Sequence, residues 1–133
     1  MRNHFVYKDK KVKKFNHVTV VEGDAEIKES TVQELDDLDM KIASSLWMLS
    51  NPEAVIARSK CSPEDTYDEK KGLIVASRKA ELKSVKRYLN RVTELKKYVQ
   101  QLLTLTQDIE DQLDFKMVRL SLDLVRNARE GKE

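Results

Sequence analysis

The feature that most constrains this chain is the stretch from Glu69 to Glu130, which has no proline and has Gly72 as its only glycine. Hydrophobic residues recur through it at spacings of three, four or seven, close to a heptad repeat, which predicts helix. These residues are Val85, Leu89, Val92, Leu95, Val99, Leu102, Ile109, Leu113, Met117, Leu120 and Leu124.

A single helix over this stretch would be about 90 Å long, whereas a compact domain of this chain length is only roughly 35–40 Å across. The helix must therefore either project and pair with another chain, or fold back. A break fits residues 104–107, because Thr104 to Gln107 followed by acidic residues resembles a second helix start. Both alternatives leave a hydrophobic seam over 85–124, which predicts a homo-oligomer.

The N-terminal half has the pattern of a small sheet and one helix. Hydrophobic and β-branched residues predict strands at about 4–8, 12–22, 25–28 and 54–60, with a turn at Asp9–Lys10. An amphipathic helix is expected over about 32–49, with a capping box from Thr31 to Glu34 and a stop at Asn51–Pro52. The predicted class is α+β: a small antiparallel sheet with one amphipathic helix over 1–68, and a long C-terminal helix or helical hairpin that oligomerises over 69–133.

Charge is distributed in blocks although the formal net charge is only +2. Residues 2–17 and 70–97 are basic, and residues 22–39 and 108–114 are acidic, a pattern typical of segments that face each other. A single cysteine excludes an internal disulfide and a Cys-rich zinc site. No signal peptide or membrane span is expected, so the predicted location is the cytoplasm. No cofactor, metal site or catalytic residue is expected.

The strongest local motif is Cys61-Ser-Pro-Glu-Asp-Thr-Tyr-Asp68, at the start of the long helix. Serine caps, proline fits the first helical position, and Asp65 adds an acid near the helix start. Capping does not explain why an aromatic residue, acids and bases gather in this turn. We therefore expect a ligand site in which Tyr67 stacks, Asp68 accepts hydrogen bonds, and basic side chains meet anionic groups. The basic residues are Arg58, Lys60 and Arg78.

The same motif, continued by Gly72, Ala76, Lys79 and Ala80, resembles a K-C-S-P-E-D-x-Y-D…G…A-x-x-K-A pattern of small bacteriophage and prophage proteins. A related H-P-x-D pattern occurs in bacterial proteins with a double-stranded-RNA-binding-like fold, and this chain has serine in place of that histidine. Small phage accessory proteins often act by binding and blocking, as the Thoeris anti-defence sponges do when they sequester nucleotide signals. The resemblance implies a non-enzymatic counter-defence protein that sequesters a host nucleotide signal or a host protein in the host cytoplasm.

Two alternatives remain open from the sequence. A basic stripe at helical spacing predicts nucleic-acid binding through phosphate contacts. A coiled-coil scaffold without a ligand is the other alternative. The stripe consists of Lys79, Lys83, Lys86, Arg87 and Arg91.

Overall fold

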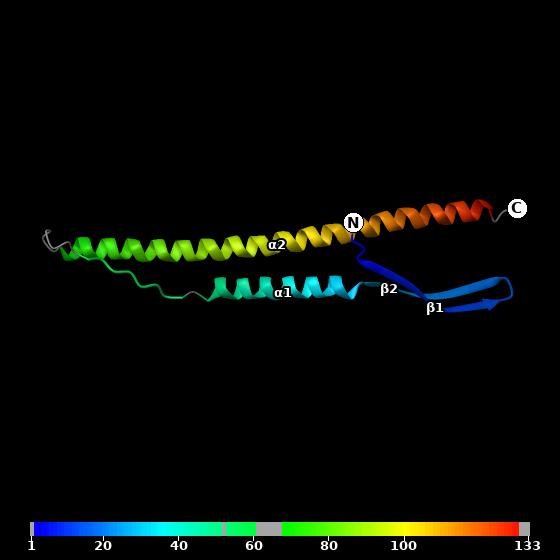
Figure 1. Cartoon of the computed structure of the whole chain (residues 1–133), viewed down its shortest axis with the longest axis horizontal. Helices are drawn as coiled ribbons and strands as arrows, with labels where there is room; N and C mark the ends of the chain where they lie inside the picture. Colours follow the sequence, from blue (N-terminus) through cyan, green and yellow to red (C-terminus); the bar gives the residue numbers. More distant parts are fainter. Residues whose placement is uncertain (1, 52, 61–67, 131–133) are drawn as a thin grey trace. The chain divides into compact units, whose positions relative to one another are not determined.

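The computed structural model describes residues 2–51, 53–60 and 68–130, and it confirms the α+β class (Figure 1). Two strands, β1 (Phe5–Phe15) and β2 (Val18–Ile27), are followed by α1 (Glu29–Ser50) and α2 (Glu69–Glu130). The contacts group the chain into unit 1, Met1–Leu38 with Gln100–Glu133, and unit 2, Asp39–Val99. Each unit therefore combines residues from both parts of the chain that were predicted from the sequence, 1–68 and 69–133.

The sheet is a single antiparallel hairpin of β1 and β2, rather than the three short strands expected at 4–8, 12–22 and 25–28. Its turn lies at Asn16–His17, between the paired residues Phe15 and Val18, and not at Asp9–Lys10. Asn16 has a φ of 52°, a left-handed conformation that asparagine adopts more readily than most residues. The expected turn at Asp9–Lys10 is instead a register shift between Asp9 and Lys11. A bulge of this kind bends a strand without reversing it.

Gly23 lies inside β2, opposite Asp9, and does not separate two strands. A Cβ atom at this position would overlap the hydroxyl end of Tyr7. The absence of a side chain at Gly23 therefore leaves room for the end of the Tyr7 ring.

Helix α1 begins at Glu29, three residues before the predicted start, and ends at Ser50. The carbonyl of Lys28 accepts the amides of Thr31 and Val32, both at 3.0 Å, so the first helical bonds start from Lys28. Thr31 is thus inside the first turn and is not the capping residue, and the expected capping box from Thr31 to Glu34 is wrong. The side chains of Thr31 and Glu34 are used elsewhere, as described below.

Helix α2 is continuous from Glu69 to Glu130, which settles the choice between one long helix and a helical hairpin. The hydroxyl groups of Thr104 and Thr106 donate to the carbonyls of Gln100 and Leu102, at 3.0 and 2.9 Å. Because these threonines bond back to their own helix, they do not start a new one.

The strand predicted over 54–60 is wrong, because residues 53–60 have no regular secondary structure. Val55 and Ile56 have strand propensity, but β-propensity depends on packing against a neighbouring strand. Here the segment is fastened to α2 by side chains.

Candidate functional site

The first predicted site residue, Asp68, caps α2. Its Oδ1 atom accepts the backbone amides of Lys70 and Lys71 at 3.1 and 3.3 Å, and its carbonyl accepts the amide of Gly72 at 2.9 Å. A carboxylate at this position satisfies free amides and complements the positive end of the helix dipole. Tyr67 and the Cys61–Asp65 part of the motif lie outside the described residues.

The three basic residues predicted to meet an anion are all exposed in unit 2. Arg78 forms an ion pair of 2.8 Å with Glu81, one helical turn further along α2. Arg58 offers its backbone carbonyl to Lys79 at 3.3 Å, which fastens the segment before Lys60 to the first turns of α2. Among the described residues of the predicted site, the Asp68 carboxylate caps α2 and Arg78 pairs with Glu81, whereas the side chains of Arg58 and Lys60 are exposed.

Four residues of the predicted nucleic-acid stripe form a row at i, i+4 spacing along α2, and the row holds residues 48–58. We call Lys79, Lys83, Arg87 and Arg91 the basic row. Lys83 Nζ donates to the carbonyl of Ile56 at 2.7 Å, and Arg87 pairs with Glu53 at 3.5 Å. The fifth residue of the stripe, Lys86, is exposed.

Arg91 is the best placed member of this row. It donates to the carbonyl of Met48 at 3.0 Å, in the last turn of α1, where a cation complements the helix dipole. The guanidinium also lies 3.9 Å from Glu53 and 5.8 Å from the centre of the Tyr88 ring. Arg91 of α2 therefore contacts both the last turn of α1 and Glu53, in the segment that follows α1, within unit 2.

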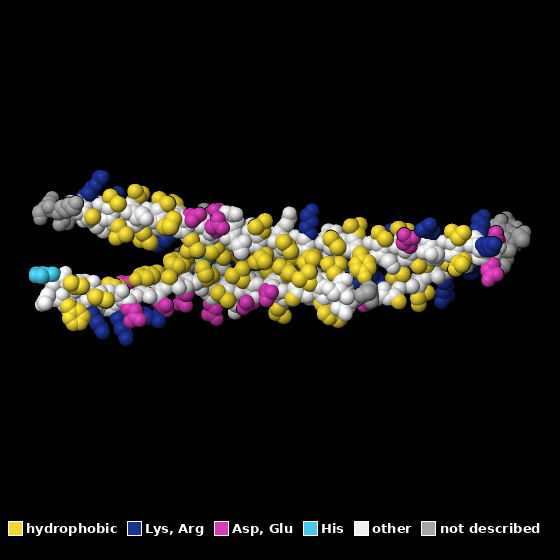
Figure 2. Space-filling view, turned by 180° about the vertical axis from the view of Figure 1, so that it is seen from behind, with side chains coloured by type: hydrophobic (Ala, Val, Ile, Leu, Met, Phe, Trp, Pro, Cys, Tyr) yellow, Lys and Arg dark blue, Asp and Glu magenta, His cyan; other side chains and the backbone are white. Residues whose placement is uncertain are grey.

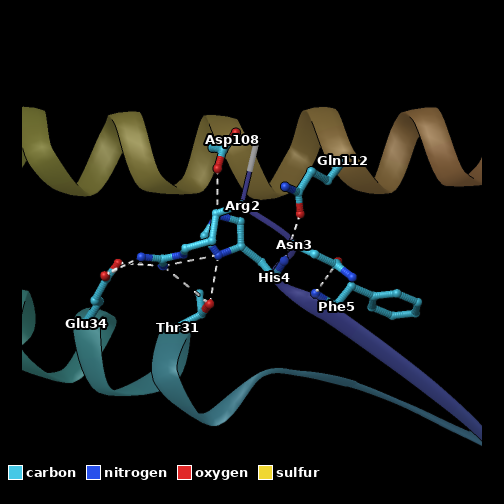
Figure 3. A network of polar contacts seen from close by, with 8 residues as sticks. All are labelled: Arg2, Asn3, His4, Phe5, Thr31, Glu34, Asp108 and Gln112. Atoms are coloured by element: carbon cyan, nitrogen blue, oxygen red, sulfur yellow. Dashed lines mark hydrogen bonds and ion pairs between the residues drawn. The ribbon is translucent and has the colours of Figure 1, made fainter.

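A different polar cluster, which the sequence did not indicate, lies in unit 1 around His4 (Figure 3). His4 is 1% exposed. Its Nδ1 atom lies 2.7 Å from Thr31 Oγ1, on α1, and its Nε2 atom lies 2.5 Å from Asp108 Oδ2, on α2. Its backbone amide donates to Gln112 Oε1 at 2.8 Å, and its carbonyl accepts the amide of Lys28 at 2.8 Å. We call His4, Thr31, Asp108 and Gln112 the His4 cluster.

The cluster has a consistent proton arrangement. Because the Asp108 carboxylate accepts, Nε2 carries the proton and donates to it, which leaves Nδ1 as an acceptor for the hydroxyl of Thr31. The guanidinium of Arg2, 3.3 Å from Nδ1, is a donor and favours the same tautomer. Both ring nitrogens are thus satisfied inside the protein.

Threonine, histidine and aspartate in hydrogen-bonded series are also the residue types of a nucleophile, a base and an orienting acid. Thr31 is 0% exposed, however, so a substrate cannot reach its hydroxyl. A nucleophile must lie in contact with the reacting atom. Thr31 therefore cannot act as a nucleophile in this structure, and the His4 cluster joins the N-terminal residues to α1 and α2 within unit 1.

Arg2 extends the cluster to the surface. Its two terminal nitrogens pair with the two carboxylate oxygens of Glu34, at 2.5 and 2.7 Å. This bidentate hydrogen bond lowers the pKa of the Glu34 carboxyl below its ordinary value and raises that of the Arg2 guanidinium. The pair fixes the N-terminal residues against α1.

An open groove of about 1090 Å³ lies between β1 and α2 in unit 1. Its walls are apolar and aromatic, and three cations lie among its lining residues. The walls include Phe5, Tyr7, Phe115 and Leu120, and the cations are Lys28, Lys116 and Arg119.

Hydrophobic side chains are exposed over most of the molecule, and many appear on the surface shown in Figure 2. Among the described residues, Leu38 is the only hydrophobic residue classed as buried, at 8% exposed. On α1, Met40 and Trp47 are 71% and 65% exposed. Such surface is normally covered by a partner.

The hydrophobic positions of α2 fall into two rows, which the sequence pattern combined into one seam. An inner row, which includes Leu95, Leu102 and Ile109, is half-buried. An outer row is exposed along the helix. We call the outer row the outer seam; it comprises Leu82, Val85, Leu89, Val92, Val99, Leu103, Leu113, Met117, Leu120 and Leu124.

The chain matches no protein-family model, no curated protein and no solved structure. In the described residues, no helix is long and apolar enough to cross a membrane.

Proposed function

We propose that this protein is a self-associating interaction protein, which works by binding and not by catalysis. The observation that carries the proposal is the exposure of its hydrophobic residues. Among the described residues, many large hydrophobic side chains of both strands and both helices are at least 37% exposed, including Phe15 at 62%, Trp47 at 65% and Leu89 at 61%. Soluble monomers rarely expose contiguous hydrophobic patches larger than a few hundred Å².

The energetic argument supports the same proposal. Each fully buried Leu or Val side chain stabilises a fold by about 1.5–3 kcal/mol relative to its exposed state. With Leu38 as the only buried hydrophobic residue among those described, the hydrophobic term of a lone chain is small. Burial of the outer seam in an oligomer would supply the missing stabilisation.

The C-terminal part of α2 adds a second argument. Exposed hydrophobic residues surround the helix over residues 115–125 and are not confined to one face. A helix of this kind is typical of the interior of an assembly. These residues are Phe115, Met117, Val118, Leu120, Leu122, Leu124 and Val125.

The test is the oligomeric state by sedimentation equilibrium, with a matched pair of variants. Leu89→Lys places a charge in the outer seam, and Asn90→Lys places the same charge at the next exposed position, outside the seam. We expect an oligomeric wild type, at least a tenfold weaker association for Leu89→Lys, and an unchanged association for Asn90→Lys. A wild-type monomer that unfolds cooperatively at high micromolar concentration would contradict the proposal.

Within this proposal, counter-defence by sequestration of a nucleotide signal or a host protein stays a prediction. An oligomer with one binding site per chain is suited to sequestration. Tyr67→Ala tests whether the motif at residues 61–68 contributes to binding. Nucleic-acid binding is less favoured, because the basic row already contacts residues 48–58.

A further inference from the structure

The outer seam carries an orientation signal in addition to its hydrophobicity. Leu82 and Val85 are three residues apart and Val85 and Leu89 are four apart, so position a starts at Leu82 and position d at Val85. The same register continues to Leu124. Three positions interrupt it with polar side chains, all of them exposed: Lys96 and Glu110 at a, and Thr106 at d.

These interruptions distinguish the two ways in which two copies of α2 can pair. In a parallel pair in register, each a residue lies against the same residue of its partner. Lys96 would then face Lys96, and Glu110 would face Glu110, so two layers would contain like charges. The basic stretch 70–97 would also run beside itself.

An antiparallel pair separates these charges. In antiparallel coiled coils an a residue of one chain shares a layer with a d residue of the other, and a two-fold axis repeats each contact. One register places Leu89 with Leu113, Val85 with Met117, and Leu82 with Leu120. These residues are exposed on the isolated chain, at 61% for Leu89 and 38% for Leu113.

The polar positions also fit this register. Lys96 shares a layer with Thr106, whose hydroxyl is already satisfied by the carbonyl of Leu102. Glu110 lies beside Val92, away from its own copy. Next to the seam, Lys86 comes opposite Asp114, and both are exposed on the isolated chain.

We propose that two copies of this chain pair antiparallel along α2, with Leu89 of each copy packed against Leu113 of the other. This inference rests on the proposed self-association and adds the orientation and the register. The basic first half of α2 in one copy then lies against the second half of the other, which contains the acidic residues 108–114.

Disulfide cross-linking of the full chain tests the orientation. Cys61→Ser first removes the only native cysteine, and Leu89→Cys and Leu113→Cys are then made in separate chains. We expect a covalent dimer on a non-reducing gel after the two chains are mixed, refolded together and oxidised. Each chain alone should give at least tenfold less dimer. Asn90→Cys mixed with Leu113→Cys is the matched control, and it should give no more dimer than the single chains.

The outcomes separate the two proposals. Efficient cross-linking of Leu89→Cys with itself would show parallel pairing and overturn this inference, although self-association would stand. An oligomer by sedimentation that gives no dimer in any mixture would overturn the register. A chain that stays monomeric by sedimentation would overturn the proposed function and this inference with it.

Discussion

The two units fasten the N-terminal half of the chain to α2 in opposite ways. In unit 1, the short side chains of His4 and Thr31 are buried and satisfy each other and Asp108. In unit 2, the basic row uses long side chains, from exposed Lys79 and Lys83 to half-buried Arg87 and Arg91, and three of them hold backbone carbonyls of residues 48–58. The contact distances are similar in both units, from about 2.5 to 3.5 Å.

The difference teaches that burial, more than distance, decides the energetic value of a polar contact. A buried donor or acceptor that loses its partner costs about 1–3 kcal/mol, because water cannot replace the partner. An exposed pair contributes about 0–1 kcal/mol, because water competes and long side chains lose entropy when they are ordered. Unit 1 should therefore be sensitive to single substitutions, and unit 2 should tolerate them.

The largest expected effect comes from His4→Ala. It leaves Thr31 and Asp108 without their partner and opens a cavity in unit 1, so we expect a loss of about 2–4 kcal/mol in the free energy of unfolding. Urea unfolding at a fixed protein concentration measures this loss. The control is His17→Ala in the hairpin turn, which is exposed and should change the value by less than about 0.5 kcal/mol. Equal effects of the two substitutions would refute the comparison.

The next largest effects are expected for alanine substitutions of Gly23 and Gly72, which should change stability in opposite directions. Gly23→Ala should lower stability, because the new Cβ would displace the Tyr7 ring in unit 1. Gly72→Ala should raise stability by about 0.5–1 kcal/mol, because alanine favours helix. Its Cβ would meet only Ser59 Oγ, at 3.9 Å. Thermal unfolding of both variants checks the signs, and a destabilised Gly72→Ala would show that unit 2 is tighter than the structure indicates.

A smaller, local effect is expected in the basic row. Lys83→Met keeps the hydrophobic stem and removes the ammonium that holds the Ile56 carbonyl. We expect faster hydrogen exchange over residues 53–60, with a change in global stability of about 0–1 kcal/mol. Lys86→Met is the control because Lys86 is exposed, and it should leave exchange unchanged. A global loss as large as that of His4→Ala would reverse the ranking of the two units.

The smallest effect concerns Arg2 and Glu34, at the exposed edge of unit 1. The bidentate hydrogen bond from Arg2 lowers the pKa of the Glu34 carboxyl. The stabilisation is therefore present above the ordinary pKa of glutamate and is lost as the pH falls through the lowered pKa in the folded state. An NMR titration of Glu34 should show this, and Arg2→Ala should return the pKa towards its ordinary value. An unchanged pKa in that variant would mean that another group holds the carboxylate.

The fold class and α2 were predictable because their signals are local. The absence of proline and the heptad-like spacing from Glu69 to Glu130 determine a helix regardless of the surroundings. The pattern left open whether this helix breaks near Thr104 and Thr106, because the same hydroxyl can cap a new helix or bond back to its own.

The hairpin turn and the 54–60 segment were mispredicted for lack of tertiary information. Asn16–His17 contains no glycine, so it carries a weak turn signal, and Asp9–Lys10 carries a stronger one that the structure uses as a bulge. Val55 and Ile56 have strand propensity, but no strand forms at residues 53–60.

The polar sites were the least predictable part. The motif turn gave a ligand hypothesis, and the structure shows Asp68 as a cap, which is its local meaning. His4 carries no local signal, because its partners Thr31 and Asp108 are distant in sequence. An isolated histidine next to a strand gives no indication that it will be buried between two helices.

The distance along the chain between His4 and Asp108 has a consequence for synthesis. These residues are 104 positions apart, and at about 5–20 residues per second the ribosome needs roughly 5–20 s to reach the second after the first. During that interval the hairpin and α1 exist without the helix that completes unit 1. Their hydrophobic side chains are then open to neighbouring nascent chains on the same messenger RNA, so the self-association proposed above would begin before either copy has finished folding.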